Sequence, residues 1–357
     1  MQTAYATVLV GGQRFLGWED ITIMASAKEA CRSFSLTVAA EMGGAAAAAL
    51  FQLFTPIRIM ESGELIFTGY VDHRAPRLGK THAEIMISGR SKGQDAVDCS
   101  CIHKTGRFEK KTPLEIAQEL DQFGIGFSSD TELDKIPEYQ LKPGATLFRE
   151  IERLARDQGV TLSGQPDGSI KLTKAGENAK RQAGLLQEGV NFEEVTGDFH
   201  AGNRHSKVHV RGQSYDGHGK DALQIDGLAE DSSVPRYRPL VLVQDANTDK
   251  KRAKKRAQNR RDKAAGEGIR ATGQVPGWRD EAGTLWTPGN IVWTSSPFLA
   301  LEQDMLIETV TYRQSAKGHG SVTNVHLVDP RAHGGKASKA GQSGAAWAGD
   351  FSNGNVA

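Results

Sequence analysis

Short runs in which apolar and polar residues alternate dominate the first hundred residues of the chain. The run from Asp20 to Met24 shows the period of two that is typical of a half-buried β-strand. Two further runs, Ile57–Met60 and Leu65–Val71, flank the turn-forming residues 61–64, which predicts a β-hairpin. Many short strands joined by tight turns are typical of a sandwich or barrel, so residues 1–104 are predicted to form a β-barrel domain.

The apolar period changes to that of helices in the next segment. Thr112 and Pro113 predict the start of a helix, because a threonine cap followed by proline suits the first helical turn, and Gly124 predicts its end. A second helix is predicted between Thr146 and Gly159, with its apolar residues on one face. Short strands follow it. We therefore expect residues 105–178 to form a small α+β module.

Strand patterns return in residues 179–332, which are predicted to form a second β-rich domain. Two stretches depart from this pattern. Residues 212–237 are polar and contain several glycines, which predicts a long loop, and residues 247–265 predict a highly charged helix. Residues 333–357 are mostly Gly, Ala and Ser with little to bury, so we expect a flexible tail.

Composition narrows the class of protein. The chain has 357 residues with a formal net charge of +1, so no global field favours nucleic acid or membrane. No secretory signal begins the sequence, and its longest apolar stretch, Ala45–Phe54, is far below the ~20 residues that span a bilayer. Three cysteines make no disulfide framework, which predicts folding in a reducing cytoplasm without stable membrane insertion.

Cys99, Cys101 and His103 are the sharpest metal candidates. If this segment is extended, all three side chains project from one face, as the ligands of a zinc site could. The spacing matches no common zinc pattern, and free cysteines commonly behave as small buried hydrophobes. The chain also lacks the usual nucleophile, phosphate-loop and HExxH motifs. We therefore expect no metal, no cofactor and no catalytic residue.

A dense basic run lies within the predicted charged helix. Its cations are opposed only by Asp262, and the three alanines between them leave a narrow face for packing. The run consists of Lys250, Lys251, Arg252, Lys254, Lys255, Arg256, Arg260, Arg261 and Lys263. Such a run suits phosphate contacts without base-specific readout, because no aromatic residues are interleaved. A solvated helix, or one that contacts an acidic neighbouring subunit, fits the pattern as well.

Several motifs occur together in a recognisable order. Individually they are short, and their order along the chain makes the set specific. They are Phe67–Asp72, Ser88–Ser91, Asp95–Ser100, Leu141–Phe148, Glu152–Val160, Asp167-Gly168, Val275–Trp278, Gly283–Trp286, Pro288, Leu306-Ile307 and Val310. The ordered set resembles the baseplate hub proteins of Mu-like contractile-tailed phages, which are related to the hub-like part of type VI secretion spikes. In this resemblance Cys99 belongs to the end of a family strand rather than to a ligand cluster.

The resemblance implies a structural virion protein rather than an enzyme. It implies a mainly β fold with α+β insertions, in which two antiparallel barrel-like domains accompany the small α+β module. A homotrimer of such chains would present six barrels to the tail tube, hold the spike below and contact other baseplate proteins. Genomic DNA would pass only in transit, and the trimer would assemble in the cytoplasm of the host bacterium before entering the virion.

Three classes of function remain open on the sequence. The first is the trimeric hub, and the second is a nucleic-acid-binding protein that uses residues 250–263. The third is a metal-dependent hydrolase, which the absence of catalytic spacing disfavours. In the tail, Trp347 and Phe351 are aromatic residues without a local core, which predicts docking on the spike or on a neighbouring tail protein.

Overall fold

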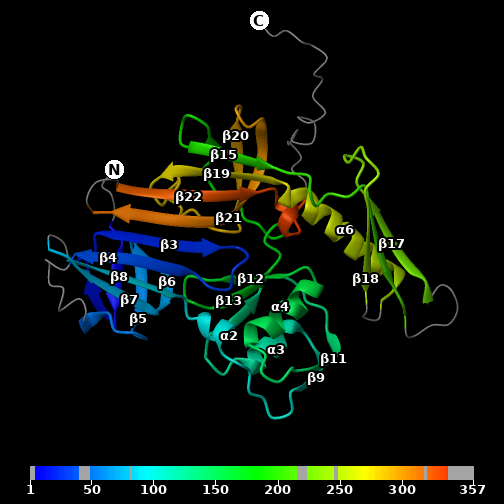
Figure 1. The fold of residues 1–357 in the computed structure, drawn as a ribbon, viewed down its shortest axis with the longest axis horizontal. Coiled ribbons are helices and arrows are strands. Elements are labelled where there is room, and N and C mark those ends of the chain that lie inside the picture. The colour runs from blue at the N-terminus through cyan, green and yellow to red at the C-terminus, as the bar shows by residue number, and fades with distance from the viewer. Residues whose placement is uncertain are drawn as a thin grey trace, which may run out of the picture.

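A computed structural model describes residues 5–39, 49–80, 83–214, 223–244, 248–316 and 320–336. The chain is mainly β, as predicted, and its few helices lie outside the sheets (Figure 1). The helices of the described residues are α2 (Gln94–Asp98), α3 (Pro113–Leu120), α4 (Leu147–Asp157), α6 (Lys250–Glu267) and the 3-10 turn η2 (Pro330–His333). None of the helices in this part of the chain is both long and apolar enough to cross a membrane.

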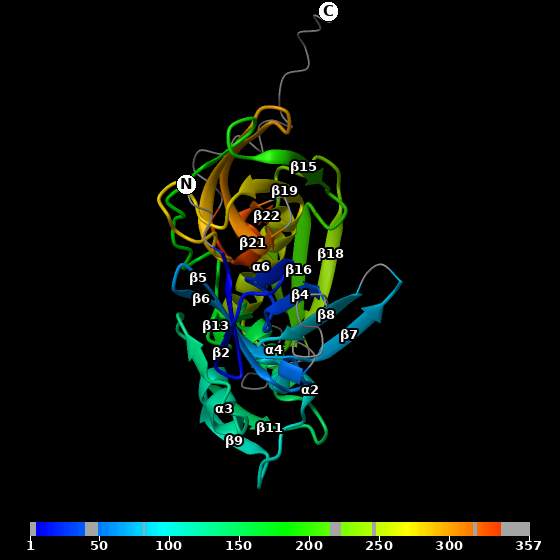
Figure 2. The same cartoon turned by 90° about the vertical axis from the view of Figure 1, so that its left-hand side faces the viewer.

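One ten-stranded sheet joins the two ends of the chain. Eight of its strands follow each other in an antiparallel path, and β20 (Ile291–Ser296) and β14 (Leu186–Gln187) branch from it at β21. In spatial order the path is β15 (Glu193–Phe199), β19 (Ile269–Pro276), β22 (Gly320–Val328), β21 (Leu301–Ser315), β3 (Asp20–Ser26), β4 (Ser33–Ala39), β8 (Ala83–Arg90) and β7 (His73–Leu78). The central pair β21–β3 is antiparallel, with Thr311 opposite Met24. The first and last thirds of the sequence therefore share one backbone ladder (Figure 2).

A second sheet covers the N-terminal half of the large one. Its strands are β2 (Gln13–Phe15), β1 (Thr7–Val10), β5 (Pro56–Glu61) and β6 (Glu64–Tyr70). The predicted hairpin is confirmed, and Ser62 and Gly63 turn the chain with φ angles of 50° and 83°. Apolar side chains from both sheets meet in one large core cluster, because alternate residues of each strand face inward. Among the described residues, no sheet closes on itself into a barrel.

The helical segment packs around a core of its own. Its strands are β9 (Arg107–Lys111), β10 (Phe127–Ser129), β11 (Ile136–Gln140), β12 (Thr161–Gly164) and β13 (Ile170–Thr173). The predicted cap at Thr112 is confirmed as a full capping box with Glu115. The first helix ends at Leu120, earlier than predicted, because the Asp121 carboxylate accepts hydrogen bonds from the Ile125 and Gly126 N–H groups. The second helix ends at Asp157, before Gly159 as expected.

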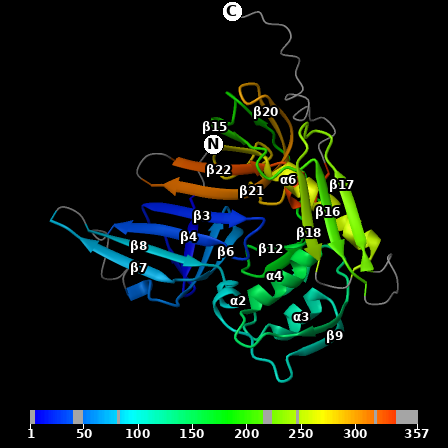
Figure 3. The same cartoon turned by 45° about the vertical axis from the view of Figure 1, so that its right-hand side comes forward.

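The loop predicted for residues 212–237 is wrong in part, because it contains strand β17 (Ile225–Glu230). Gly227 and Ala229 provide two of its three inward positions, so the strand lacks the large apolar side chains that reveal a strand. β17 pairs with β16 (Lys207–Gly212), which also pairs in parallel with β18 (Pro239–Gln244). Helix α6 covers one face of this three-stranded sheet (Figure 3). It runs from residue 250 to 267 rather than from 247 to 265.

Candidate interaction surfaces

Helix α6 is attached to its sheet through alanine and glycine. Ala253 and Ala257 are fully buried and pack with Val208 and Val210 of β16. A Cβ atom at Gly227 would lie 2.2 Å from the carbonyl carbon of Ala253, so the backbones of β17 and α6 are in direct contact. This close approach fixes the helix although only a narrow stripe of it is apolar. The rest of its circumference is left to charged residues.

The first two turns of α6 present their cations to solvent. All six of Lys250, Lys251, Arg252, Lys254, Lys255 and Arg256 are exposed. Arg252 pairs with Asp249 at 3.5 Å, Arg261 pairs with Asp262 at 2.7 Å, and Lys263 pairs with Glu267 at 3.8 Å. Within the described ranges, the remaining cations of the run have no carboxylate partner. They are Lys250, Lys251, Lys254, Lys255, Arg256 and Arg260.

The cations in the first turn of α6 do not stabilise the helix. The N-terminus of a helix carries a partial positive charge, which favours acidic side chains in the first turn. In α6 the first turn contains no acidic residue and three basic ones, and the only compensation is the N-cap, Asp249, whose carboxylate accepts from the Arg252 N–H at 2.8 Å. An anionic surface placed against α6 would remove this repulsion. The charge pattern of the first turn therefore lowers the stability of the helix itself.

The candidate metal ligands are not arranged as an extended strand. Cys99 is the C-cap residue of the short helix α2, so its expected place at the end of a strand is wrong. Burial, with a smaller contribution from the Glu150 carboxylate, raises the pKa of Cys101 to about 11, which disfavours the thiolate that binds metals. His103 accepts a hydrogen bond from the Gly106 N–H through Nδ1, and its Nε2 lies 3.3 Å from Glu119. No group of three potential ligands gathers anywhere in the described residues.

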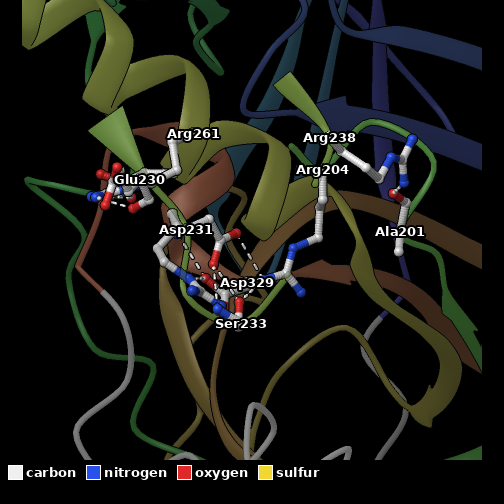
Figure 4. A network of polar contacts seen from close by, with 10 residues as sticks. Ala201, Arg204, Glu230, Asp231, Ser233, Arg238, Arg261 and Asp329 are labelled. Atoms are coloured by element: carbon white, nitrogen blue, oxygen red, sulfur yellow. Dashed lines mark hydrogen bonds and ion pairs between the residues drawn. The ribbon is translucent and has the colours of Figure 1, made fainter. Parts of the chain in front are cut away.

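A network of arginines and acids ties the α6 sheet to the rest of the chain (Figure 4). Arg204 lies 2.9 Å from Asp231 at the end of β17, and Arg238 donates to the Ala201 and Gly202 carbonyl oxygens at 3.1 and 2.9 Å. Burial alone would raise the pKa of Asp231, but hydrogen bonds from Ser233 and Arg204 lower it overall. The carboxylate therefore stays charged, and the network holds β17 in place.

A second ionic contact joins an N-terminal residue of the described chain, Lys28, to two C-terminal ones, Glu308 and His333. The Glu308 carboxylate on β21 is 2.8 Å from Lys28 Nζ and 3.0 Å from His333 Nε2. Burial would raise the pKa of Glu308, but the hydrogen bonds from His333 and Lys28 lower it to about 2. The Ala27 N–H also donates to the Glu308 carbonyl oxygen at 2.8 Å. No local pattern predicts this contact, because Lys28 and His333 are 280 and 25 residues away from Glu308.

The predicted tail begins at the last described residues of the chain. Trp347 and Phe351 lie outside the described residues. His333, where the predicted tail begins, is part of η2 and is held by its contact with Glu308.

Models of known protein families match three successive parts of the chain. Residues 6–91 match the N-terminal domain described as Mu phage baseplate assembly protein GpP-like. Residues 93–174 match the second domain of baseplate hub protein gp44-like, and residues 249–334 match the fourth domain of Mu phage baseplate assembly protein GpP. The matches follow the order of the domains in the family descriptions and extend over most of the described chain.

The similar individual proteins are a baseplate hub protein and two tail proteins. Baseplate hub protein gp44 of Escherichia phage Mu is 26% identical over 324 residues, which cover 85% of this chain and 83% of the phage protein. The 43 kDa tail protein of prophage MuSo2 from Shewanella oneidensis is 28% identical, with a TM-score of 0.80 over 92% of this chain and 98% of its own. A tail protein from Neisseria meningitidis MC58 shares the fold at 20% identity, with a TM-score of 0.76 over 92% and 99% of the two chains.

Proposed function

The chain belongs to the family of Mu-like phage baseplate hub proteins, and from this premise we propose that it forms the trimeric centre of a contractile tail's baseplate. In this role it joins the tail tube to the membrane-piercing spike. The observation that carries the proposal is the ordered match of three hub and baseplate domains, together with the similarity to the phage Mu hub over 85% of the chain.

The strand order supports the two-barrel part of the proposal. Counted outward from the central pair, the N-terminal half gives β3, β4, β8 and β7, and the C-terminal half gives β21, β22, β19 and β15. Each half thus contributes four antiparallel strands; β20 and β14 branch from the C-terminal half, and the separate sheet of β2, β1, β5 and β6 accompanies the N-terminal half. Two similar units per chain would let three chains present six to a sixfold tail tube, because symmetry matching needs repeated surfaces rather than a catalytic site.

We propose the domain limits on the same basis. Residues 1–104 and 179–332 would be the two barrel-like units, and residues 105–178 would pack at their periphery. The tail, residues 333–357, would dock on the spike or on another baseplate protein through Trp347 and Phe351. Phage DNA would meet the assembled hub only in transit. The domain matches favour this hub over a nucleic-acid-binding protein that uses α6.

The mass of the purified chain in solution tests the proposal. Size-exclusion chromatography with light scattering should give three times the chain mass, and negative-stain images should show a ring with threefold symmetry. The matching spike protein should co-elute with this species. A chain that stays monomeric at about 10 µM, well above the concentrations at which obligate assemblies dissociate, would contradict the trimer.

A further inference from the structure

A small pocket lies at one end of the three-stranded sheet that α6 covers. It is formed between residues 201–204, which precede β16, and residues 233–238, which connect β17 to β18. The pocket has a volume of about 100 Å³, which is room for several water-sized atoms and therefore for one small ligand group. Three of its seven lining residues are arginines, namely Arg204, Arg236 and Arg238, and none is acidic.

The walls of the pocket are held in place by the chain itself. The Asp231 N–H donates to the Ser206 carbonyl oxygen at 2.9 Å, and the Arg238 N–H donates to the Ser206 hydroxyl oxygen at 2.8 Å. These two bonds tie the connection between β17 and β18 to the segment that precedes β16. Pro235 restricts the backbone further, because its ring fixes φ. The conformation of the lining backbone is therefore set before any ligand binds.

Only one of the three arginine charges is neutralised within the described chain. Arg204 is paired with Asp231 at 2.9 Å (Figure 4). Arg238 donates to two backbone carbonyl oxygens at 3.1 and 2.9 Å, and carbonyl groups carry no net charge. Arg236 is exposed and has neither an ion pair nor a hydrogen bond among the described residues. Two positive charges thus remain beside a pocket of this size.

The carboxylate that pairs with Arg204 is not available to the other two arginines. Asp231 Oδ2 accepts from Arg204 at 2.9 Å, and Asp231 Oδ1 accepts from the Ser233 N–H at 3.1 Å and from the Ser233 hydroxyl group. Both oxygens are therefore occupied within the chain. An anion from outside the described chain is needed to neutralise Arg236 and Arg238.

We propose that this pocket binds a doubly charged phosphate group through Arg236 and Arg238. The planar guanidinium group offers parallel N–H donors that match two oxygens of a phosphate or a carboxylate. Two uncompensated arginine charges favour the phosphate, because a phosphate monoester carries nearly two negative charges at neutral pH and a carboxylate carries one. An internal phosphate of a nucleic acid also carries only one. The ligand is therefore free phosphate or the terminal phosphate of a monoester.

Isothermal titration of the full chain with sodium phosphate, at constant ionic strength and about pH 8 where phosphate is doubly charged, measures the affinity. Arg236→Ala should weaken binding by about tenfold or more, because a hydrogen bond between two charged groups is lost. Folding should be unaffected, since Arg236 has no partner among the described residues. Arg236→Lys keeps the charge but not the planar fork, so its affinity should lie between those of Arg236→Ala and the wild-type chain.

The matched control is Lys255→Ala, which also removes one exposed cation without a carboxylate partner in the described chain, but from α6. It should leave the affinity within about twofold of the wild-type value, because salt screens distant exposed charges. Ala201→Glu places a carboxylate at the wall of the pocket and should weaken phosphate binding with all three arginines present. Hydrogen exchange locates the ligand, since added phosphate should increase protection in residues 231–238.

Competing anions identify the chemistry of the occupant. Sulfate is also a doubly charged tetrahedral oxyanion and should compete with phosphate, whereas acetate should compete far more weakly. A nucleoside monophosphate that binds at least as tightly as free phosphate identifies a monoester as the occupant, and one that binds more weakly identifies the free ion. Equal losses of affinity in Arg236→Ala and Lys255→Ala would overturn the inference, because phosphate would then respond to overall charge. Absence of binding at millimolar phosphate would overturn it as well.

Discussion

The large sheet and the α6 unit, which we define as residues 207–267, reach their folded state by different means. The core against the large sheet contains bulky residues such as Phe34, Phe67 and Tyr312, supplied by strands from both ends of the chain. The core of the α6 unit consists of Val208, Val210, Ile225, Ala229, Ala253 and Ala257. Since burial free energy follows buried apolar area, the α6 unit contributes far less to stability.

Several large side chains of the same unit are exposed. Val241 and Val243 of β18 are 47% and 70% exposed, and Tyr237 just before them is 78% exposed. On the opposite side of the sheet, α6 presents its unpaired cations. Packing and exposed charge are therefore divided between the two regions: the large sheet holds the larger apolar core, and the α6 unit carries the dense run of exposed cations.

The difference between the two regions is tested most directly by replacing one buried valine with alanine in each of them. Val310 of β21 and Val210 of β16 are both fully buried. Val310→Ala removes two methyl groups from the large core and should lower the free energy of unfolding by about 2–3 kcal/mol, including the cavity left behind. Val210→Ala should cost less, about 1–2 kcal/mol, because small alanine neighbours collapse around the gap more easily. Urea denaturation measures both.

Hydrogen exchange then shows in which region of the chain each variant loses stability. Val310→Ala should lower protection throughout the sheet, whereas Val210→Ala should lower it only within residues 207–267. Equal losses of protection in both regions for either variant would mean that the α6 unit and the sheet unfold as one body.

Much of the fold could be predicted because its signals are local. The hairpin around Ser62 and the cap at Thr112 each depend on a few adjacent residues, and both are confirmed. Strand β17 was missed because its inner face is Ile225, Gly227 and Ala229, whose small size suits direct contact with α6. Nothing in the local pattern of these residues shows that a helix lies against them.

Some of the surface features can likewise be predicted from the sequence, and others can be recognised only in the folded chain. The basic run of α6 is visible in the composition, and the exposure of its first two turns agrees with the expected small-residue face. The two strands that end the large sheet, β7 and β15, can be identified only once the strand pairing is known, because an edge is a property of the whole sheet. The contact of Glu308 with Lys28 and His333 likewise requires the two ends of the chain to be adjacent.

The contact of Glu308 with Lys28 and His333 allows a second test of what stabilises the large sheet. In the unfolded chain Glu308 has an ordinary pKa near 4.5, and in the folded chain it is lowered to about 2. The carboxylate therefore stabilises the fold above pH 4.5, and this contribution is lost as the pH falls towards 2. Glu308→Gln should cost about 1.5–2 kcal/mol at neutral pH, because the Lys28 ammonium group and the His333 N–H lose their carboxylate acceptor.

The pH dependence separates this effect from simple loss of packing. The difference in unfolding free energy between the wild-type chain and Glu308→Gln should shrink as the pH is lowered from 5 towards 2, and the two chains should converge in acid. Exposed Glu302→Gln on the same strand provides the control, and we expect it to follow the wild-type curve. If the difference in unfolding free energy stays constant across this pH range, Glu308 stabilises the fold through packing rather than through its charge.

The smallest predicted change in stability concerns the charged residues of α6. Lys250 and Lys251 lie in the first turn of α6, where cations oppose the helix dipole, whereas Lys263 lies near its C-terminal end and pairs with Glu267. Lys250→Glu with Lys251→Glu should stabilise α6 by about 0.3–1 kcal/mol per site. Lys263→Glu should destabilise it by about 0.5–1 kcal/mol, because it opposes the dipole and repels Glu267. Hydrogen exchange of α6 at low salt measures both.

Changes of the same sign would mean that overall charge, not position on the helix, decides the outcome. Opposite signs would show that the cations at the start of α6 reduce folding stability, so their presence is better explained by an anionic partner than by the fold.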